Sequence, residues 1–183
     1  MTQLAAWRQA GVVLQLAVNV SASNLLEPDF NARVADGLAR HGLDASCLSL
    51  EITESALMTN PKVAQAALEA LAATGVHLAI DDFGTGYSSL SYLQRLPVKV
   101  VKIDQSFMRG LDTDPRRRSL VGAMIKLSQN LGHKVVAEGV ETDVILAVLR
   151  GMDCDQAQGY LFARPLAPAS LVAWMEQAEA VAA

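Results

Sequence analysis

The stretch "LAIDDFGTGYSSL" at residues 78–90 places two carboxylates, Asp81 and Asp82, side by side directly after an apolar run. Adjacent carboxylates repel each other, so the pair either caps a loop and helix or has something positive between its members. The "GTG" that follows lacks the lysine and the spacing of a Walker loop, so these glycines alone are a weak sign of nucleotide binding. A cap and a cation site both remain open from this stretch.

Other polar residues end similar apolar runs along the chain. Near-continuous apolar runs lie at 14–20, 48–52, 76–81, 98–103, 134–138 and 158–162, and such runs are typical of strands that are covered on both faces. Polar residues lie at the ends of four of the other runs: Asn19 in the first, Glu51 in the second, Lys102 with Asp104 in the fourth and Glu138 in the fifth. Gln158 lies at the start of the sixth run or within it. Glu54 lies three residues beyond Glu51, and we expect it to anchor a loop instead.

The segments between these runs have helical periodicity. Asn60 and Pro61 predict the start of a helix over "PKVAQAALEALAAT", and a glycine predicts its end. The corresponding predicted helix ends along the chain are Gly42, Gly75, Gly132 and Gly151. Strand and helix in alternation predict an α/β fold with a parallel sheet, and residues 1–183 contain no linker, so we expect one domain. In a parallel barrel the carboxyl ends of all strands open onto one face, where active sites lie, so we expect the polar residues to converge there.

The converging residues predict a metal site. Carboxylate and amide oxygens are the ligands that Mg²⁺ and Mn²⁺ prefer, and the candidate ligands are Asn19, Glu51, Asp81, Asp82 and Glu138. Two ions about 3.5–4 Å apart are the usual apparatus for cleaving phosphodiesters. Lys102 is expected to stabilise charge on the phosphate or to orient the attacking water. Each residue alone also has a simpler interpretation, such as a helix cap, a turn or a salt bridge, and the coincidence at successive strand ends favours the metal site.

Composition excludes several classes of function. The net charge is −4 and the chain has no basic stripe, so we expect no binding to DNA. The basic cluster "PRRRS" at 115–119 is expected to open a solvated helix. The chain has two cysteines without metal-binding spacing, no apolar run of about 18 residues and no secretory signal. We therefore expect a cytoplasmic protein without a membrane segment.

Six ordered motifs carry a resemblance to a known family: "VNVSASNL", "LEITES", "AIDDFGTGYSSLSYL", "VKIDQSF", "VVAEGVET" and "QGYLFARPL". Together they resemble the successive motifs of EAL-domain cyclic-di-GMP phosphodiesterases, over essentially the whole chain. The resemblance implies hydrolysis of cyclic-di-GMP to linear pGpG in bacterial second-messenger signalling. It also implies two bound ions, Mg²⁺ or Mn²⁺.

The resemblance assigns a role to each candidate residue. Ligands of the first ion would be Asn19, Glu51 and Asp81, and those of the second Asp81, Asp82 and Glu138. Glu138 would also be the general base, and Lys102 would contact the hydrolytic water or the phosphate. Further polar residues of the active site would be Asp104, Glu141 and Gln158. Glu54 would steady the loop "FGTGYSS", which in the family links metal binding to dimerisation.

The chain departs from the family pattern at its beginning. The Glu-Ala-Leu motif, whose glutamate is a metal ligand and whose following arginine helps to hold the substrate, does not occur upstream of Asn19. A complete barrel has eight strands and about 250 residues. We therefore expect a TIM-type (β/α) barrel that is truncated at its N-terminus, with about six of eight strands present and the first two absent. Such a sheet would stay open and form a homodimer, exchange elements between chains, or belong to a longer protein with sensor or other signalling domains.

Three functions remain open from the sequence. The first is a metal-dependent phosphodiesterase, weakened by one absent ligand. The second is a receptor that binds cyclic-di-GMP without hydrolysing it. The third is a dimerisation module that uses an exposed sheet edge or the loop after Asp82.

Overall fold

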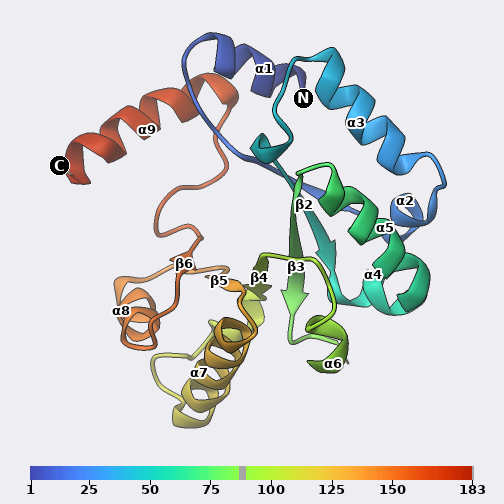
Figure 1. Cartoon of the computed structure of the whole chain (residues 1–183). Helices are drawn as coiled ribbons and strands as arrows, with labels where there is room; N and C mark the ends of the chain where they lie inside the picture. The colour runs from blue at the N-terminus through green and yellow to red at the C-terminus, as the bar shows by residue number, and fades with distance from the viewer. Residues whose placement is uncertain (87–89, 183) are drawn as a thin grey trace.

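A single parallel sheet forms the centre of the protein (Figure 1). The computed structural model describes residues 1–86 and 90–182. The six strands are β1 (Leu16–Val20), β2 (Leu48–Thr53), β3 (His77–Phe83), β4 (Val100–Ile103), β5 (Lys134–Ala137) and β6 (Gln156–Ala157). Each strand pairs with its neighbour in sequence, in the order β1-β2-β3-β4-β5-β6. The sheet is curved (Figure 1). It is not closed into a barrel, because among the described residues β1 and β6 do not pair with each other.

Helices follow the strands and lie around the outside of the curved sheet (Figure 1). The helices are α1 (Thr2–Gln9), α2 (Ala22–Leu26), α3 (Phe30–Arg40), α4 (Glu54–Thr59), α5 (Pro61–Ala73), α6 (Leu90–Leu93), α7 (Pro115–Asn130), α8 (Asp143–Gly151) and α9 (Pro168–Ala182). Two short 3₁₀ turns, η1 (Ala45–Cys47) and η2 (Gln105–Phe107), precede β2 and follow β4. No helix within the described ranges is both long enough and apolar enough to cross a membrane.

Alternate residues of each strand face opposite sides of the sheet, and the two sides differ in chemistry. On β2, Leu48, Leu50 and Ile52 are buried in the hydrophobic core with residues of the outer helices such as Leu68 of α5 and Ile125 of α7. Ser49 and Glu51, which lie between them, line a cavity of about 590 Å³ on the other face of the sheet. Residues of neighbouring strands complete the lining, both polar or small (Lys102, Ala17, Ala79) and apolar (Val100, Val136). The apolar face therefore holds the helices, and the inner face is free to carry polar side chains.

The predicted helix boundaries are correct in most places. The Asn60 side chain accepts a hydrogen bond from the backbone N–H of Val63 (3.5 Å), and Pro61 occupies the first position of α5. Gly75, with φ of 91°, follows the end of that helix. The helix α8 ends at Gly151 as predicted, but the left-handed conformation falls at Asp153 (φ 55°) and not at this glycine.

The sixth strand lies earlier in the chain than the sequence predicts. The predicted strand was 158–162, whereas β6 comprises only Gln156–Ala157. Residues 158–162 instead bend around Val140: the Val140 N–H donates to the Gln158 carbonyl (3.0 Å), and the Leu161 N–H donates to the Val140 carbonyl (3.0 Å). The apolar run "QGYLF" thus reflects packing of a turn, and Gln158 follows the last strand.

Candidate metal centre

Three carboxylates from two strand ends form a compact cluster. Asp81 and Asp82 belong to the end of β3, and Glu138 directly follows β5. One carboxylate oxygen from each of the three lies within 4.8 Å of the others. Hard divalent cations bind such oxygen donors, so the chemistry and spacing of the cluster fit a metal ion.

A local distortion of β3 lets two adjacent residues serve one site. Successive side chains of a regular strand point to opposite faces, yet Asp81 and Asp82 both reach the cluster. The register of β3 against β4 shifts between Ile80 and Phe83, and Asp82 has a left-handed φ of 54°. Aspartate is among the residues that tolerate this conformation best. The irregularity turns the second carboxylate toward the first.

Lys102 of β4 lies at the middle of the cluster. Its Nζ is 2.7 Å from Glu51 Oε2, 2.7 Å from Glu138 Oε1 and 3.3 Å from Asp81 Oδ1. The Lys102 side chain is only 8% exposed. One buried ammonium group therefore links carboxylates from β2, β3 and the end of β5.

The electrostatic environment shifts the pKa of three groups in this cluster. Burial alone would lower the pKa of Lys102, but its hydrogen bonds to Glu138 and Glu51 outweigh burial and raise the pKa. Burial raises the pKa of Glu138, although the hydrogen bond from Lys102 opposes the shift. Burial also raises the pKa of Asp82, and the nearby charges of Asp81 and Asp104 raise it further. Burial and the neighbouring carboxylates therefore disfavour the ionised forms of Asp82 and Glu138.

Glu54 holds the loop that follows Asp82, as far as the structure describes that loop. The Glu54 side chain is buried, and its Oε2 accepts a hydrogen bond from the backbone N–H of Gly84 (3.0 Å). A methyl group added at Gly86 would lie 2.9 Å from Glu54 Oε1, so the loop backbone passes directly over this carboxylate. The rest of the predicted loop, residues 87–89, lies outside the described residues.

Asn19 and Glu51 line a groove beside the cluster. The groove has a volume of about 800 Å³, and Asp81, Asp82 and Thr53 also line it. Asn19 is on the edge strand β1 and is exposed. Glu51 of β2 is paired with Asn19 of β1 in the sheet register, so the two side chains lie next to each other on the same face of the sheet.

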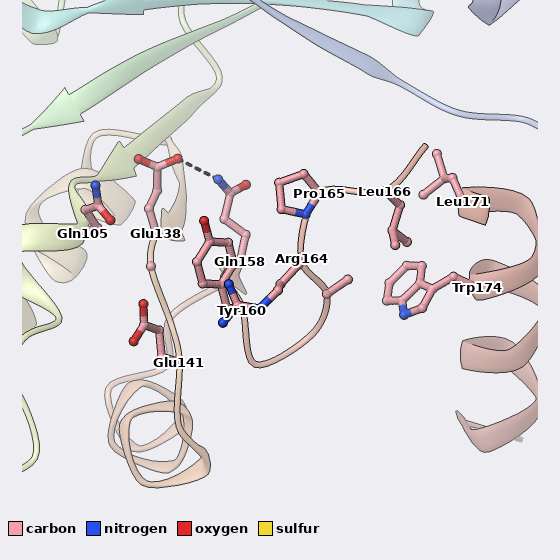
Figure 2. A pocket seen from close by; sticks show the side chains of 13 residues that line it. Gln105, Glu138, Glu141, Gln158, Tyr160, Arg164, Pro165, Leu166, Leu171 and Trp174 are labelled. Carbon is pink, nitrogen blue, oxygen red and sulfur yellow. Dashed lines mark hydrogen bonds between the residues drawn. The ribbon is translucent and has the colours of Figure 1, made fainter. Parts of the chain in front are cut away.

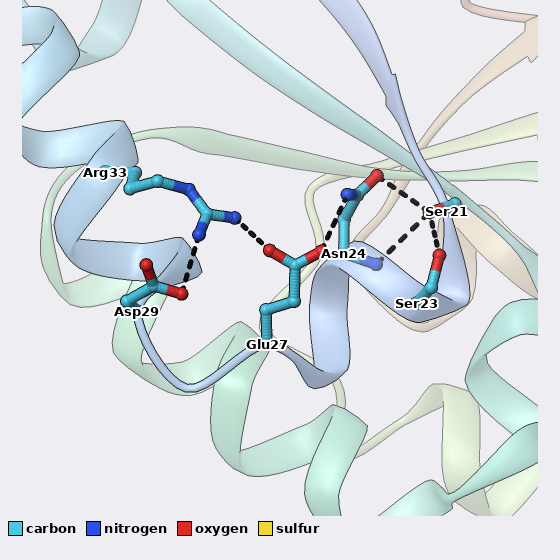
Figure 3. A network of polar contacts seen from close by, with 6 residues as sticks. All are labelled: Ser21, Ser23, Asn24, Glu27, Asp29 and Arg33. Carbon is cyan, nitrogen blue, oxygen red and sulfur yellow. Dashed lines mark hydrogen bonds and ion pairs between the residues drawn. The ribbon is translucent and has the colours of Figure 1, made fainter.

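A polar network fixes the chain directly after Asn19 (Figure 3). The Ser21 hydroxyl caps α2 by accepting from the Asn24 N–H (3.2 Å), and it donates to Asn24 Oδ1 (2.7 Å). Asn24 Nδ2 donates to Glu27 (3.3 Å), and Arg33 pairs with both Glu27 and Asp29. The network connects α2 with the first turn of α3 and so holds the end of β1 in place.

Two of the remaining predicted residues, Gln158 and Glu141, lie on the other side of Glu138 from the groove. Gln158 Nε2 donates to Glu138 Oε1 (2.7 Å). Glu141 is exposed and lines, with Gln158 and Glu138, a cavity of about 560 Å³. Asp104 does not face this cavity but caps η2 by accepting from the Ser106 N–H (3.0 Å).

The cavity contains aromatic residues that the sequence did not single out (Figure 2). The guanidinium carbon of Arg164 lies 4.5 Å from the centre of the Tyr160 ring. Figure 2 shows Glu138 on one side, Trp174 of α9 on the other and Tyr160 between them. A stacked aromatic and arginine pair beside carboxylates is a signal only in three dimensions, because the sequence predicts Tyr160 within a strand and gives no sign that Arg164 stacks on it.

The sequence and structure are similar to those of known proteins. The family model of the EAL domain matches residues 1–165. The chain is 49% identical over 158 residues to the cyclic di-GMP phosphodiesterase NbdA of Pseudomonas aeruginosa. The match covers 86% of this chain and 20% of NbdA. The structure of the phosphodiesterase PaMucR in complex with c-di-GMP superimposes on this chain with a TM-score of 0.88 and 40% sequence identity. The match covers 92% of this chain and 69% of the PaMucR chain. A manganese and cyclic-di-GMP complex of Klebsiella pneumoniae BlrP1 is 33% identical, with a TM-score of 0.81, and covers 90% of this chain and 42% of that one.

These matches differ greatly in length from the present chain. The first two curated relatives match it over 20% and 30% of their own length. The matching part of each is therefore one portion of a longer protein.

Proposed function

This chain belongs to the EAL-domain family, and from that premise we propose that it hydrolyses cyclic-di-GMP to linear pGpG with the help of two divalent metal ions, Mg²⁺ or Mn²⁺. The observation that carries the proposal is the carboxylate cluster of Asp81, Asp82 and Glu138 at the carboxyl ends of parallel strands. In barrel folds of this kind that face is where reactions occur.

Five residues would hold the ions. The first ion would take Asn19, Glu51 and Asp81, and the second would take Asp81, Asp82 and Glu138. Asp81 would bridge them, which gives a physical reason for the adjacent aspartates. When bound, the ions would neutralise charge on the scissile phosphate and acidify the attacking water.

Glu138 would accept the proton of the attacking water. Its raised pKa favours this role, because a general base is most effective when its pKa lies near the operating pH. Lys102 and Gln158 both donate to Glu138 Oε1, so they fix the orientation of the carboxylate. Lys102 would also stabilise charge that develops on the phosphate.

The two cavities beside the cluster would accommodate the dinucleotide. With the scissile phosphate at the cluster, one half of the molecule would extend into the groove beside Asn19 and the other into the cavity beside Gln158. The Tyr160 ring and the Arg164 guanidinium offer flat faces on which a base can stack. Glu141 would provide a hydrogen-bond acceptor at the rim.

The surroundings of the domain are part of the same proposal. Residues 1–183 would form one EAL-type domain of a longer cytoplasmic protein with sensor or other signalling domains, as the length of the relatives suggests. The first two strands of the barrel would come from outside these residues. The free edges of β1 and β6, with the loop after Asp82, would support a homodimer, since unpaired strand edges favour association.

A second candidate is binding of cyclic-di-GMP without turnover. Lys102 already neutralises part of the charge on Glu51 and Glu138. A metal ion therefore gains less electrostatic energy at Glu51. A site that holds its ions too weakly for catalysis would bind the dinucleotide without hydrolysing it.

Product analysis and calorimetry distinguish the two candidates. Residues 1–183 would be incubated with cyclic-di-GMP and Mn²⁺, and linear pGpG measured by chromatography, with Glu138→Gln as the matched variant. Hydrolysis requires product from the original chain and none from Glu138→Gln. Binding in calorimetry with Ca²⁺, without product under Mn²⁺, supports the receptor. A chain that neither binds nor hydrolyses the dinucleotide contradicts both.

A further inference from the structure

The 3₁₀ turn η2 contacts the backbone beside two separate members of the carboxylate cluster. It comprises Gln105–Phe107 and follows β4, which lies between β3, with Asp82 near its end, and β5, which Glu138 directly follows. Neither Gln105 nor Phe107 belongs to the cluster itself. Both nevertheless lie against glycines that follow the cluster residues within two positions.

On the β3 side, Phe107 packs against Gly84. A methyl group added at Gly84 would lie 2.9 Å from two carbons of the Phe107 ring and 2.5 Å from the terminal carbon of Met124 in α7. Gly84 also donates its N–H to Glu54 from the other direction. The loop that follows Asp82 is thus held between Glu54 and Phe107, and Asp82 keeps its left-handed conformation within that loop.

On the β5 side, Gln105 packs against Gly139. A methyl group added at Gly139 would lie 2.5 Å from the Cβ and 3.2 Å from the Cα of Gln105, closer than real side chains approach. The Glu138 N–H donates to the carbonyl of Ile103, two residues before η2 (3.1 Å). The backbone at Glu138 therefore rests on the same short segment as the loop after Asp82.

Arg117 of α7 holds this segment from outside the barrel. Its Nη1 donates to the Ser106 carbonyl at the centre of η2 (2.7 Å). The neighbouring Arg116 is exposed, and its side chain forms no hydrogen bond or ion pair with the described residues. A three-residue turn has few hydrogen bonds of its own, so the anchor from a sixteen-residue helix limits its movement.

We infer that η2, anchored by Arg117, is a positioning element that fixes the separation of Asp82 and Glu138. Phe107 fixes the position of Asp82 and Gln105 that of Glu138, so a shift of the turn would change the distance between the two carboxylates. The consequence for metal binding rests on the proposed function. Arg117 and Phe107 would act through the backbone and would touch neither ion nor substrate.

The test compares Arg117→Ala with Arg116→Ala, a matched removal of an arginine from the same helical turn. Hydrogen exchange is measured in segments 82–86 and 138–141, and Mn²⁺ affinity is measured by calorimetry on the full chain. We expect Arg117→Ala to increase exchange in both segments and to weaken Mn²⁺ binding by about 10-fold, the lower range for residues that orient metal ligands. Arg116→Ala should change neither. Phe107→Ala should reproduce the effect, and Phe107→Leu should restore most of the affinity.

Three outcomes are decisive. Faster exchange in both segments together with weaker Mn²⁺ binding supports the positioning element. A lower melting temperature without a change in either quantity overturns it, because Arg117 would then have only a general structural role. Faster exchange in both segments of a protein whose unmodified form binds no Mn²⁺ keeps the positioning element and contradicts the proposed function.

Discussion

Replacing Lys102 by methionine is expected to destabilise the metal-free protein and to strengthen its binding of Mn²⁺. Methionine keeps a long, unbranched side chain but removes the ammonium group that contacts Glu51, Glu138 and Asp81. These three carboxylates would then repel each other without a counter-charge. A divalent ion would supply the missing positive charge, so the variant should need the ion more than the original chain does.

The size of the effect follows from burial. Removal of one partner from a buried ion pair costs about 3–5 kcal/mol. The carboxylates here remain 13–15% exposed, and water reduces their repulsion, so we expect the lower value, about 3 kcal/mol. For a domain of this size, that loss lowers the melting temperature by about 6–12 °C.

The assay is thermal unfolding followed by circular dichroism, first in EDTA and then across a titration of Mn²⁺. Lys99→Met is the control, because Lys99 is an exposed lysine directly before the same strand. We expect Lys99→Met to melt within about 2 °C of the original chain. We expect Lys102→Met to melt lower in EDTA and to recover more than the original chain as Mn²⁺ is added.

Two results would refute this reasoning. If Lys102→Met melts like the original chain in EDTA, the ammonium group does not balance the carboxylates. If it melts lower but Mn²⁺ gives it no larger recovery, the carboxylates do not form a cation site. Loss of hydrolysis in the same variant would not decide between these results.

Three further predictions concern pH and packing. Burial and two neighbouring aspartates raise the pKa of Asp82 above its value in the unfolded chain. This carboxyl group therefore stabilises the fold at acidic pH, and its contribution is lost as the pH rises through the raised pKa. We expect the free energy of unfolding in urea to depend less on pH in metal-free Asp82→Asn than in the original chain. Asp155→Ala removes the acceptor of the Val135 N–H in β5 and should lower the free energy of unfolding in urea by about 1–3 kcal/mol. The control Asp153→Asn breaks only an exposed ion pair and should lower it by less than about 0.5 kcal/mol. Equal losses would show that the hydrogen bond from Val135 to Asp155 does not stabilise the strand. Gly159→Ala would place a methyl group 2.2 Å from the carbonyl oxygen of Val140 and should cost about 3 kcal/mol or more, and a variant that unfolds at the original urea concentration would show that this turn is not rigid.

The placement of the site was predictable from sequence because two simple rules combine. Apolar runs mark buried parallel strands, and parallel strands end on the same face. These rules placed Glu51, Asp81 and Lys102 on neighbouring strands, and in the structure the Lys102 ammonium group contacts both carboxylates. The sequence offered both a phosphate contact and a salt bridge for Lys102, but it could not show that one lysine reaches three carboxylates at once.

Other features depend on contacts that periodicity does not report. The run at 158–162 is as near-continuously apolar as the runs that form strands, but the close approach of Gly159 to the Val140 backbone makes it a turn. The stacking of Arg164 on Tyr160 depends on the path of that turn. The support that Phe107 gives to Gly84 joins residues from two different strand ends, and neither residue carries a sign of it in the sequence.

The strictly sequential order of the strands bears on how the polypeptide acquires its shape during synthesis. Each new strand docks beside the one made just before it, so the growing chain can add βα units in turn without waiting for distant partners. The cluster, in contrast, needs Glu138, which the ribosome releases long after Asp81. A nascent chain would therefore have an ordered sheet before the complete cluster of Asp81, Asp82 and Glu138 could form.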